Sequence, residues 1–307
     1  MTAIDRMALR RVTDRAVTFL VSRQAETGIW QDFDLEPGSS DAWVTAYVGQ
    51  ALQSVGGSEA DQARGRAADW LQQAHRPSGG WGYNALTPVD ADTTAHALLF
   101  LLGQQSAVPA AAVGRLRHFA NPDGSFRTFD GHDSEHSWGH GHPEVTAAAA
   151  RTLYLFGEAA DVALVDAATA YLRATQQSNG LWQAFWWTTP LYSAVEAIQL
   201  LDTCGGGYDR EDLRRALAAP AAGAFEEALQ VRLLVSQGFR QRADIVMGRL
   251  LASQQLDGSW RSIPILRVTA PDSSLDVPAG PIAADSERLF TTATVVLALA
   301  AYSRGDM

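Results

Sequence analysis

The sequence contains no lysine, so arginine supplies all 24 of its basic side chains. Without lysine, Schiff-base chemistry is excluded, and only an arginine or a metal ion could hold a phosphate group. The single cysteine, Cys204, excludes an internal disulfide framework and a cysteine-based zinc cluster. No run of about 18 uncharged apolar residues occurs, and the N-terminus lacks the apolar core of a signal peptide. We therefore expect a cytoplasmic protein with no integral membrane segment.

The charge balance is acidic, with 34 acidic residues, 24 basic residues and a formal net charge of −10. Binding to nucleic acid requires a basic face, and no cluster of arginines here forms one. Nucleic acid is therefore excluded as the main partner. Hydrophobic residues make up 47% of the 307 positions, which suits one large domain or two ordinary ones. Length alone does not choose between these arrangements.

An internal repeat of about fifty residues indicates the architecture. Five segments share the end of a helix, a Gln or Asn, a short glycine turn and an aromatic residue. They end at Trp30, Trp81, Phe126, Trp182 and Trp260. A second series lies just downstream of these turns, at residues 41–46, 90–95, 142–147 and 288–293, with a looser copy at 189–194. Each member of the second series begins a helix that is apolar nearly all round, so these helices should be surrounded by protein.

We therefore predict an all-α fold, in which six helix pairs close into a single (α/α)6 toroid, a double ring that forms one domain over residues 1–307. The apolar helices form the inner ring, at residues 44–52, 94–102, 145–156, 194–201 and 291–301. A sixth, unmarked inner helix is expected around residues 225–235. Amphipathic helices that carry arginines, such as residues 6–23, 62–73 and 240–254, form the outer ring.

The inner helices of such a ring run parallel, so their first turns should meet at one mouth. The side chains expected there are Asp41, Asp90, Asp92, His142, Glu144, Arg288 and Phe290. We expect Arg288, whose place in the series is equivalent to that of Asp90, to contact any phosphate, because a guanidinium suits phosphate oxygens. Residues 264–284, with four prolines and no clear period, indicate a long excursion that could cover the mouth.

Two carboxylates open one of these inner helices. Asp90 lies where an N-cap belongs, directly after Pro88 and Val89, so Asp92 falls on the second helical residue. There it lies beside unpaired N–H groups and the positive end of the helix dipole. In isolation this pattern is typical of ordinary capping. In the setting of the ring it also predicts a strong carboxylic acid at the mouth.

Three other stretches near the mouth allow more than one interpretation. Four acidic residues lie in residues 30–43, where a solvated turn is favoured over a cation site: Asp32, Asp34, Glu36 and Asp41. Four histidines follow Asp130 and could trap a metal if they lay on one helical face: His132, His136, His140 and His142. The glycines and the proline among them favour a loop instead, and we predict no metal site. Five aromatic residues within eleven positions indicate either core packing or a cavity that stabilises positive charge: Trp182, Phe185, Trp186, Trp187 and Tyr192.

At these residues the sequence resembles the catalytic domain of the class II terpene cyclases, which include squalene-hopene cyclase and bacterial diterpene and sesquiterpene cyclases. The aromatic turns resemble that superfamily's glutamine-tryptophan (QW) repeats. Residues 90–95, Asp-Ala-Asp-Thr-Thr-Ala, resemble its Asp-x-Asp-Asp-Thr-Ala motif in a DxDTT variant, in which Thr93 replaces the last aspartate. The resemblance implies that Asp92 protonates a carbon–carbon double bond, with Asp90 and Thr93 beside it. It also implies a histidine hydrogen-bonded to the acid, and we expect His140 first and His136 second.

The same resemblance implies a binding cavity around the acid. The residues that we expect to contact the substrate or to stabilise its cation are Trp186, Tyr192, Trp43, Phe290, Trp187, Glu144, His142 and Arg288. Class II cyclases usually add a second helical domain, whereas we expect a single domain here. The cavity must then be closed by residues 264–284, by a second subunit in a homodimer or other assembly, or not at all.

Together these features predict an isomerase or intramolecular lyase of isoprenoid secondary metabolism. The reaction is the protonation-initiated cyclisation of an acyclic isoprenoid, with a prenyl diphosphate such as farnesyl or geranylgeranyl diphosphate as the expected substrate. No cofactor is certain, and Mg²⁺ is expected only if the substrate is a diphosphate. One alternative is an acid-catalysed cyclase or isomerase of a non-terpenoid polyene or other metabolite. The other is a non-catalytic toroid that binds an isoprenoid or a partner helix.

Overall fold

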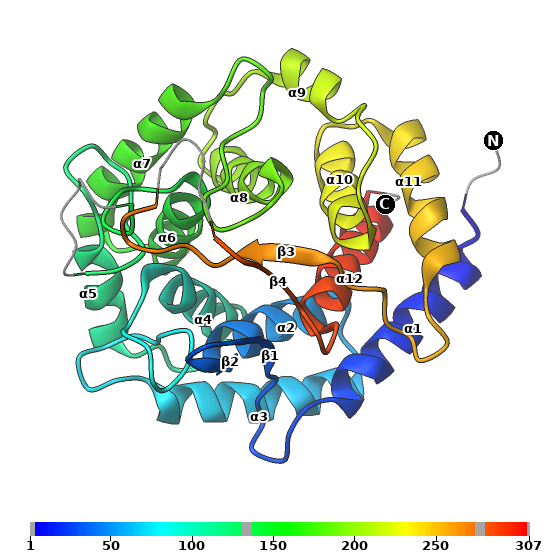
Figure 1. The fold of residues 1–307 in the computed structure, drawn as a ribbon, viewed down its shortest axis with the longest axis horizontal. Helices are drawn as coiled ribbons and strands as arrows, with labels where there is room; N and C mark the ends of the chain where they lie inside the picture. The colour runs from blue at the N-terminus through cyan, green and yellow to red at the C-terminus, as the bar shows by residue number, and fades with distance from the viewer. Residues whose placement is uncertain (1–3, 131–136, 274–279, 306–307) are drawn as a thin grey trace.

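The structure of the protein, a computed structural model, describes residues 4–130, 137–273 and 280–305 (Figure 1). Two concentric rings of α-helices make up most of this part of the chain. The inner ring consists of α2 (Ala42–Val55), α4 (Ala91–Gly103), α6 (Pro143–Phe156), α8 (Pro190–Thr203), α10 (Ala224–Ser236) and α12 (Leu289–Arg304). The outer ring consists of α1 (Arg6–Ser22), α3 (Ser58–Ala74), α5 (Ala110–His118), α7 (Val162–Thr175), which follows the short 3-10 helix η1 (Ala159–Asp161), α9 (Arg210–Ala216) and α11 (Arg240–Ser253).

The inner ring is closed, because each inner helix contacts the next and α12 contacts α2. The predicted (α/α)6 toroid is confirmed, and α10 is the unmarked sixth inner helix. The apolar character of the inner helices explains their position. In α4, for example, every residue from Ala91 to Leu101 is buried except Asp92. No helix in the described ranges combines the length and the apolar character that a bilayer crossing requires.

The five aromatic turns tie the outer ring to the inner ring. In four of them the indole Nε1 donates to a carbonyl ten residues earlier in the chain, from Trp30 to Leu20 at 2.7 Å, Trp81 to Leu71 at 2.9 Å, Trp182 to Leu172 at 2.7 Å and Trp260 to Leu250 at 2.8 Å. Four turns also donate a backbone N–H to a threonine Oγ1 of the next inner helix, from Trp30 to Thr45, Trp81 to Thr94, Phe126 to Thr146 and Trp260 to Thr292. These threonines therefore occupy equivalent positions, as predicted, and the four inner helices begin on the same face.

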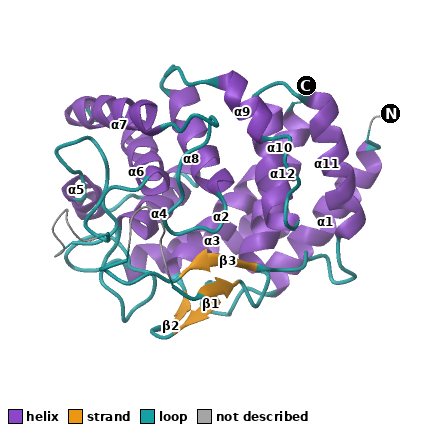
Figure 2. Cartoon of the chain, turned by 45° about the horizontal axis from the view of Figure 1, so that its top comes forward, coloured by secondary structure: helices purple, strands orange, loops and turns teal. Residues whose placement is uncertain are grey.

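Two short antiparallel sheets lie over that face (Figure 2). The first is the hairpin of β1 (Asp32–Leu35) and β2 (Gly38–Ser40), in which Asp32 pairs with Ser40. The second pairs β3 (Pro264–Arg267) with β4 (Ile282–Ala284), and β3 crosses the middle of the ring in Figure 1. The Arg267 N–H donates to the Trp186 carbonyl at 2.7 Å, which ties β3 to the aromatic segment. The described part of residues 264–284 thus lies across the mouth.

Candidate active site

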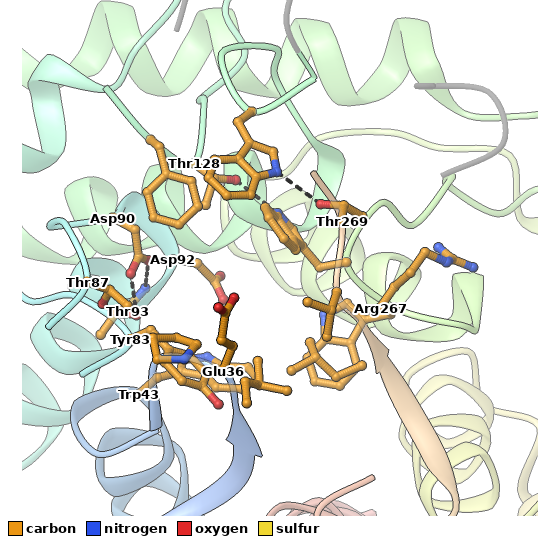
Figure 3. A pocket seen from close by; sticks show the side chains of 18 residues that line it. Glu36, Trp43, Tyr83, Thr87, Asp90, Asp92, Thr93, Thr128, Arg267 and Thr269 are labelled. Atoms are coloured by element: carbon orange, nitrogen blue, oxygen red, sulfur yellow. Dashed lines mark hydrogen bonds between the residues drawn. The ribbon is translucent and has the colours of Figure 1, made fainter. Parts of the chain in front are cut away.

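A cavity of about 570 Å³ opens at the mouth, between the first turn of α4, the β1–β2 hairpin and β3 (Figure 3). Its wall is mainly aromatic. Four tryptophans line it, together with Tyr83 and Phe129: Trp43, Trp138, Trp186 and Trp187. The charged residues of the described lining are Glu36, Asp90, Asp92 and Arg267. The chemistry of the cavity therefore depends on carboxyl groups set in an apolar wall.

Asp90 is the N-cap of α4, as the sequence predicts. Its Oδ1 accepts from the Thr93 N–H at 2.7 Å, and its Oδ2 accepts from the Thr93 hydroxyl at 2.8 Å. Only 4% of Asp90 is exposed, and this burial raises the pKa of its carboxyl to about 7. Thr93, which replaces an aspartate of the family motif, thus serves to hold Asp90 in place.

Asp92 lies two residues further on, and its carboxyl is aimed into the cavity. Its Oδ1 is buried and has no hydrogen-bond partner among the described residues. Burial raises the pKa of Asp92 well above its usual value, and the neighbouring carboxyls of Asp90, Glu144 and Glu196 raise it further. This setting favours the protonated form of the carboxyl, which is the form that can donate a proton. The side chain is still 18% exposed, so it can reach a molecule in the cavity.

His96 is the histidine nearest to this acid. It lies one turn further along α4, with Nε2 3.7 Å from Asp92 Oδ1. This distance is longer than a hydrogen bond, and contacts between catalytic groups are often long before a substrate binds. The Gln50 amide donates to His96 Nδ1 at 3.2 Å and to the His96 carbonyl at 3.1 Å, so Nδ1 is an acceptor and Nε2 carries the proton. Burial lowers the pKa of His96 to about 4, so the ring is neutral. The Tyr192 hydroxyl lies 3.4 Å from the same Nε2.

Of the two histidines that we expected beside the acid, only His140 is described. His140 lies against the Gly141 carbonyl, outside the cavity lining, and His136 falls outside the described residues. Sequence reasoning missed His96, although a signal was present. Asp92 and His96 are four positions apart on one helix and therefore share a face.

The expected aromatic residues divide into two layers. Trp43, Trp186 and Trp187 line the cavity, whereas Tyr192 and Phe290 are buried behind them. The Trp187 ring stacks on Tyr192 with centroids 4.1 Å apart and on Phe290 at 5.1 Å. The deeper rings therefore hold the exposed faces of the front layer in position. Trp138 and Phe129, which sequence reasoning did not single out, also line the cavity, with ring centroids 4.9 Å apart.

Glu144 and His142 support this wall from outside the cavity lining. Glu144 is buried, and its Oε1 accepts from the N–H groups of Phe185 at 2.9 Å and Trp186 at 3.1 Å. Its Oε2 accepts from the Ser193 hydroxyl at 3.0 Å. His142 stacks on Phe185 at 4.0 Å, and burial lowers its pKa to about 3, so it is neutral. The position of both residues fits a role in holding the aromatic segment, and not the direct substrate contact that we expected.

Arg288 also lies outside the cavity lining. Its guanidinium donates to the Ser259 hydroxyl at 2.7 Å and pairs with Asp257 at 2.9 Å, both in the last aromatic turn. The expected contact with a phosphate does not fit this placement, because a local carboxylate already holds the charge. Arg267 in β3 is the one arginine among the described lining residues. Within the described ranges, no group of three or more His, Cys, Asp or Glu side chains is arranged to hold a metal ion.

The acidic residues of residues 30–43 are neither a solvated turn throughout nor a cation site. Asp32 is buried, and its carboxylate accepts from the N–H groups of Glu287 at 3.0 Å and Leu289 at 2.9 Å. It therefore satisfies backbone donors where the chain enters α12. Glu36, in the turn of the β1–β2 hairpin, is exposed and lines the cavity.

The raised pKa of Asp92 predicts a pH-dependent stability difference between the wild type and Asp92→Asn. Above the unfolded-state value of 3.8 and below its own raised pKa, the folded protein binds more protons than the unfolded chain, so Asp92 lowers the unfolding free energy as pH rises. Asparagine removes this effect. We expect the variant to gain stability relative to the wild type as the pH rises from 4 to 8. Urea unfolding at pH 4 and pH 8 measures the difference in unfolding free energy. The prediction is wrong if the wild type becomes more stable relative to the variant as the pH rises.

Two curated proteins and several solved structures are similar to this chain. No protein-family model matches the chain. The labda-7,13-dienyl diphosphate synthase of Streptomyces clavuligerus is 39% identical over 84 residues, which cover 27% of this chain and 14% of that protein. Sporulenol synthase of Bacillus subtilis (strain 168) is 25% identical over 206 aligned residues, which cover 56% of this chain and 32% of that protein. The chain therefore spans much less than half the length of these two curated relatives.

Among solved structures, the type II terpene cyclase MstE from Scytonema superimposes with a TM-score of 0.84 and 27% identity, over 98% of this chain and 100% of that one. A variant of that cyclase was solved in complex with its substrate, geranylgeranyl dihydroxybenzoate, and superimposes with a TM-score of 0.82 and 26% identity over 97% of this chain and 98% of that one. The match to these structures extends over nearly the whole ring.

Proposed function

We propose that this protein, which has the fold of the class II terpene cyclases, cyclises an acyclic isoprenoid by protonating it. One observation carries this proposal. The Asp92 side chain lines a cavity walled by tryptophans, and its buried Oδ1 has no hydrogen-bond partner in the described structure. An unpaired acid in an apolar cavity suits a substrate that offers it no polar atom, such as an alkene.

The proposed chemistry follows from the residues of the cavity. Asp92 gives its proton to a terminal double bond, a C–H bond forms as the O–H bond breaks, and a carbocation results. The π electrons of the next double bond close a ring onto that cation, and loss of a proton at the end makes the whole reaction an isomerisation. The faces of Trp43, Trp186 and Trp187 stabilise the moving positive charge, each by about 2 kcal/mol when water is excluded. Asp90 keeps a second carboxyl beside the acid for the return of its proton.

The relatives support an isoprenoid substrate but differ in its polar head group. One curated relative is named for a diphosphate, and one solved relative was crystallised with a geranylgeranyl aryl carboxylate. The chain length of the isoprenoid therefore stays a prediction, as do a cytoplasmic location and a homodimer. We also propose that residues 1–307 act as one domain, with β3 as the cover of the cavity in place of a second subunit.

A labelling experiment tests the proposal. Purified protein is incubated in D₂O with farnesyl and geranylgeranyl diphosphate, the corresponding alcohols, squalene and geranylgeranyl dihydroxybenzoate, with and without Mg²⁺. Protonation by an acid that exchanges with solvent predicts a cyclic product that carries a single new deuterium and retains its head group. Cyclic products that release diphosphate and carry no solvent deuterium would overturn the proposal.

His96 provides a second test, because the proposal makes it a positioning residue for the acid. Its neutral Nε2–H lies 3.4 Å from the Tyr192 hydroxyl and 3.7 Å from Asp92 Oδ1, so it can turn from the hydroxyl to the carboxylate that forms when the proton leaves. A hydrogen bond to a charged group contributes about 1.5–3 kcal/mol, so His96→Phe should lower kcat by roughly 10- to 100-fold. It should also shift the pH profile of kcat, which a purely structural loss does not do. Gln50→Leu, which frees Nδ1 without removing the ring, should have a smaller effect in the same direction. A His96→Phe enzyme with wild-type kcat and pH profile contradicts this role.

A further inference from the structure

The described lining of the cavity carries more acidic than basic groups, and this balance limits the charge of the substrate's head group. The inference rests on the proposed function. Three carboxyl groups and one guanidinium belong to the described lining: Glu36, Asp90, Asp92 and Arg267. Figure 3 shows Arg267 on the opposite side of the cavity from Asp90 and Thr93. If an alkene end of the substrate meets Asp92, the polar head lies toward Arg267.

Arg267 has limited capacity for an anion. Its Nη1 donates to the carbonyls of Ala184 at 3.3 Å and Phe185 at 3.0 Å, which uses two of the five N–H donors of the guanidinium. The remaining donors suit one carboxylate or one phenol oxygen. They could hold one phosphate group, but one guanidinium charge does not balance the several negative charges of a diphosphate.

Three arginines in the loops around the ring are held by local acceptors. Arg76 donates to the carbonyls of Ala85 and Thr87, in the loop before α4. Arg127 pairs with Asp130 at 2.8 Å, and Arg288 is held by Asp257. Because the chain contains no lysine, no other type of side chain could add a permanent positive charge. Within the described ranges there is also no cluster of ligands for a bridging metal ion.

A diphosphate would therefore bring more than one negative charge into an apolar cavity that already holds carboxyl groups. Buried charge without a matching partner costs several kcal/mol in effective terms. A neutral polar head group does not carry this cost, and the cavity offers it hydrogen-bond partners. The hydroxyls of Thr128 and Thr269 line the cavity and accept from the indole N–H groups of Trp186 and Trp138, each at 3.0 Å. Their own O–H protons remain available to an oxygen of the head group.

We propose that this cavity takes an isoprenoid whose head group carries at most one negative charge, an alcohol, a phenol or an aryl carboxylate, and not a diphosphate. Arg267 and Thr269 meet the head group, and Glu36 at the cavity entrance repels polyanions. Glu36 is therefore a specificity-determining residue, because its carboxylate makes the more highly charged ligand the weaker one.

The predicted head-group preference is tested by measuring how isoprenoid probes bind to the Asp92→Asn protein, which should not turn them over. The probes are geranylgeraniol, 3-geranylgeranyl-4-hydroxybenzoate and geranylgeranyl diphosphate, the last with and without Mg²⁺, and the readout is quenching of the tryptophans that line the cavity. We expect the alcohol and the benzoate to bind about tenfold or more tightly than the diphosphate. Glu36→Gln should strengthen binding of the diphosphate about threefold or more and leave the alcohol unchanged. Glu26→Gln, at an exposed glutamate outside the cavity lining, is the matched control and should change neither.

Arg267→Gln separates the two acceptable head groups. It should weaken the benzoate by about tenfold, as the loss of a charge-assisted pair predicts, and leave the alcohol nearly unchanged. Tighter binding of the diphosphate than of the alcohol, with or without Mg²⁺, overturns the inference while the proposed cyclase stands. If none of the isoprenoid probes binds, the proposed function fails together with the inference.

Discussion

Asp92→Asn should abolish cyclisation, with a fall in turnover on the order of 10³-fold or more, while substrate affinity stays within about threefold of the wild type. The reason is that no other group can replace Asp92 as the proton donor. Asp92 lines the cavity and has one carboxyl oxygen without a hydrogen-bond partner among the described residues, whereas both oxygens of Asp90 accept from Thr93. Water is too weak an acid at neutral pH to replace it. Product formation is measured by mass spectrometry over a time long enough to detect the residual rate.

The matched control for this variant is Asp41→Asn. Asp41 caps α2 as Asp90 caps α4, but it lies outside the lining of the main cavity. Because asparagine is about as good an N-cap as aspartate, this control should keep both fold and turnover. A second companion, Thr93→Asp, restores the carboxylate of the family motif and tests whether Asp90 needs its threonine partner. If Asp92→Asn turns over at the wild-type rate on the true substrate, the acid is only part of a helix start and the cyclase proposal is wrong.

Glu144→Ala should be the most destabilising single change, with a loss of about 3 kcal/mol or more in unfolding free energy. Glu144 is buried and accepts from three donors, the N–H groups of Phe185 and Trp186 and the hydroxyl of Ser193. Alanine leaves all three donors without an acceptor in the core. Because Trp186 lines the cavity, the same change should also lower turnover and reduce the quenching of tryptophan fluorescence by a bound isoprenoid.

Glu144→Gln is the informative comparison. Glutamine has nearly the shape of glutamate, and burial raises the pKa of Glu144, which lowers the cost of removing its charge. The glutamine Oε1 can still accept from both backbone N–H groups, and its amide can donate to the Ser193 oxygen. Urea unfolding should therefore show a loss of less than about 1 kcal/mol for glutamine. Equal losses for alanine and glutamine would indicate that the hydrogen bonds to the aromatic segment do not hold the wall.

The architecture could be predicted from the sequence because it depends on local, repeated features. Each aromatic turn is built from residues close in the chain, and each indole reaches a carbonyl ten residues earlier. Apolar helices must be buried wherever they lie, so the division into inner and outer rings follows from composition. The phase of Thr45, Thr94, Thr146 and Thr292 places the inner helices on one face, and the pair of Asp90 and Asp92 falls at the mouth for the same reason.

Only the tertiary structure decided which residues surround the acid, because those contacts join segments far apart in the chain. His96 lies beside Asp92, and its tautomer depends on Gln50 of the neighbouring helix α2. Arg288 shares the register of Asp90, but Asp257 lies within reach of its guanidinium and holds it outside the cavity lining. Arg267 reaches the cavity because β3 crosses the ring to pair with residues near Trp186. A repeat therefore specifies the backbone position of a residue, whereas charges and hydrogen-bond partners from distant segments decide where its side chain lies.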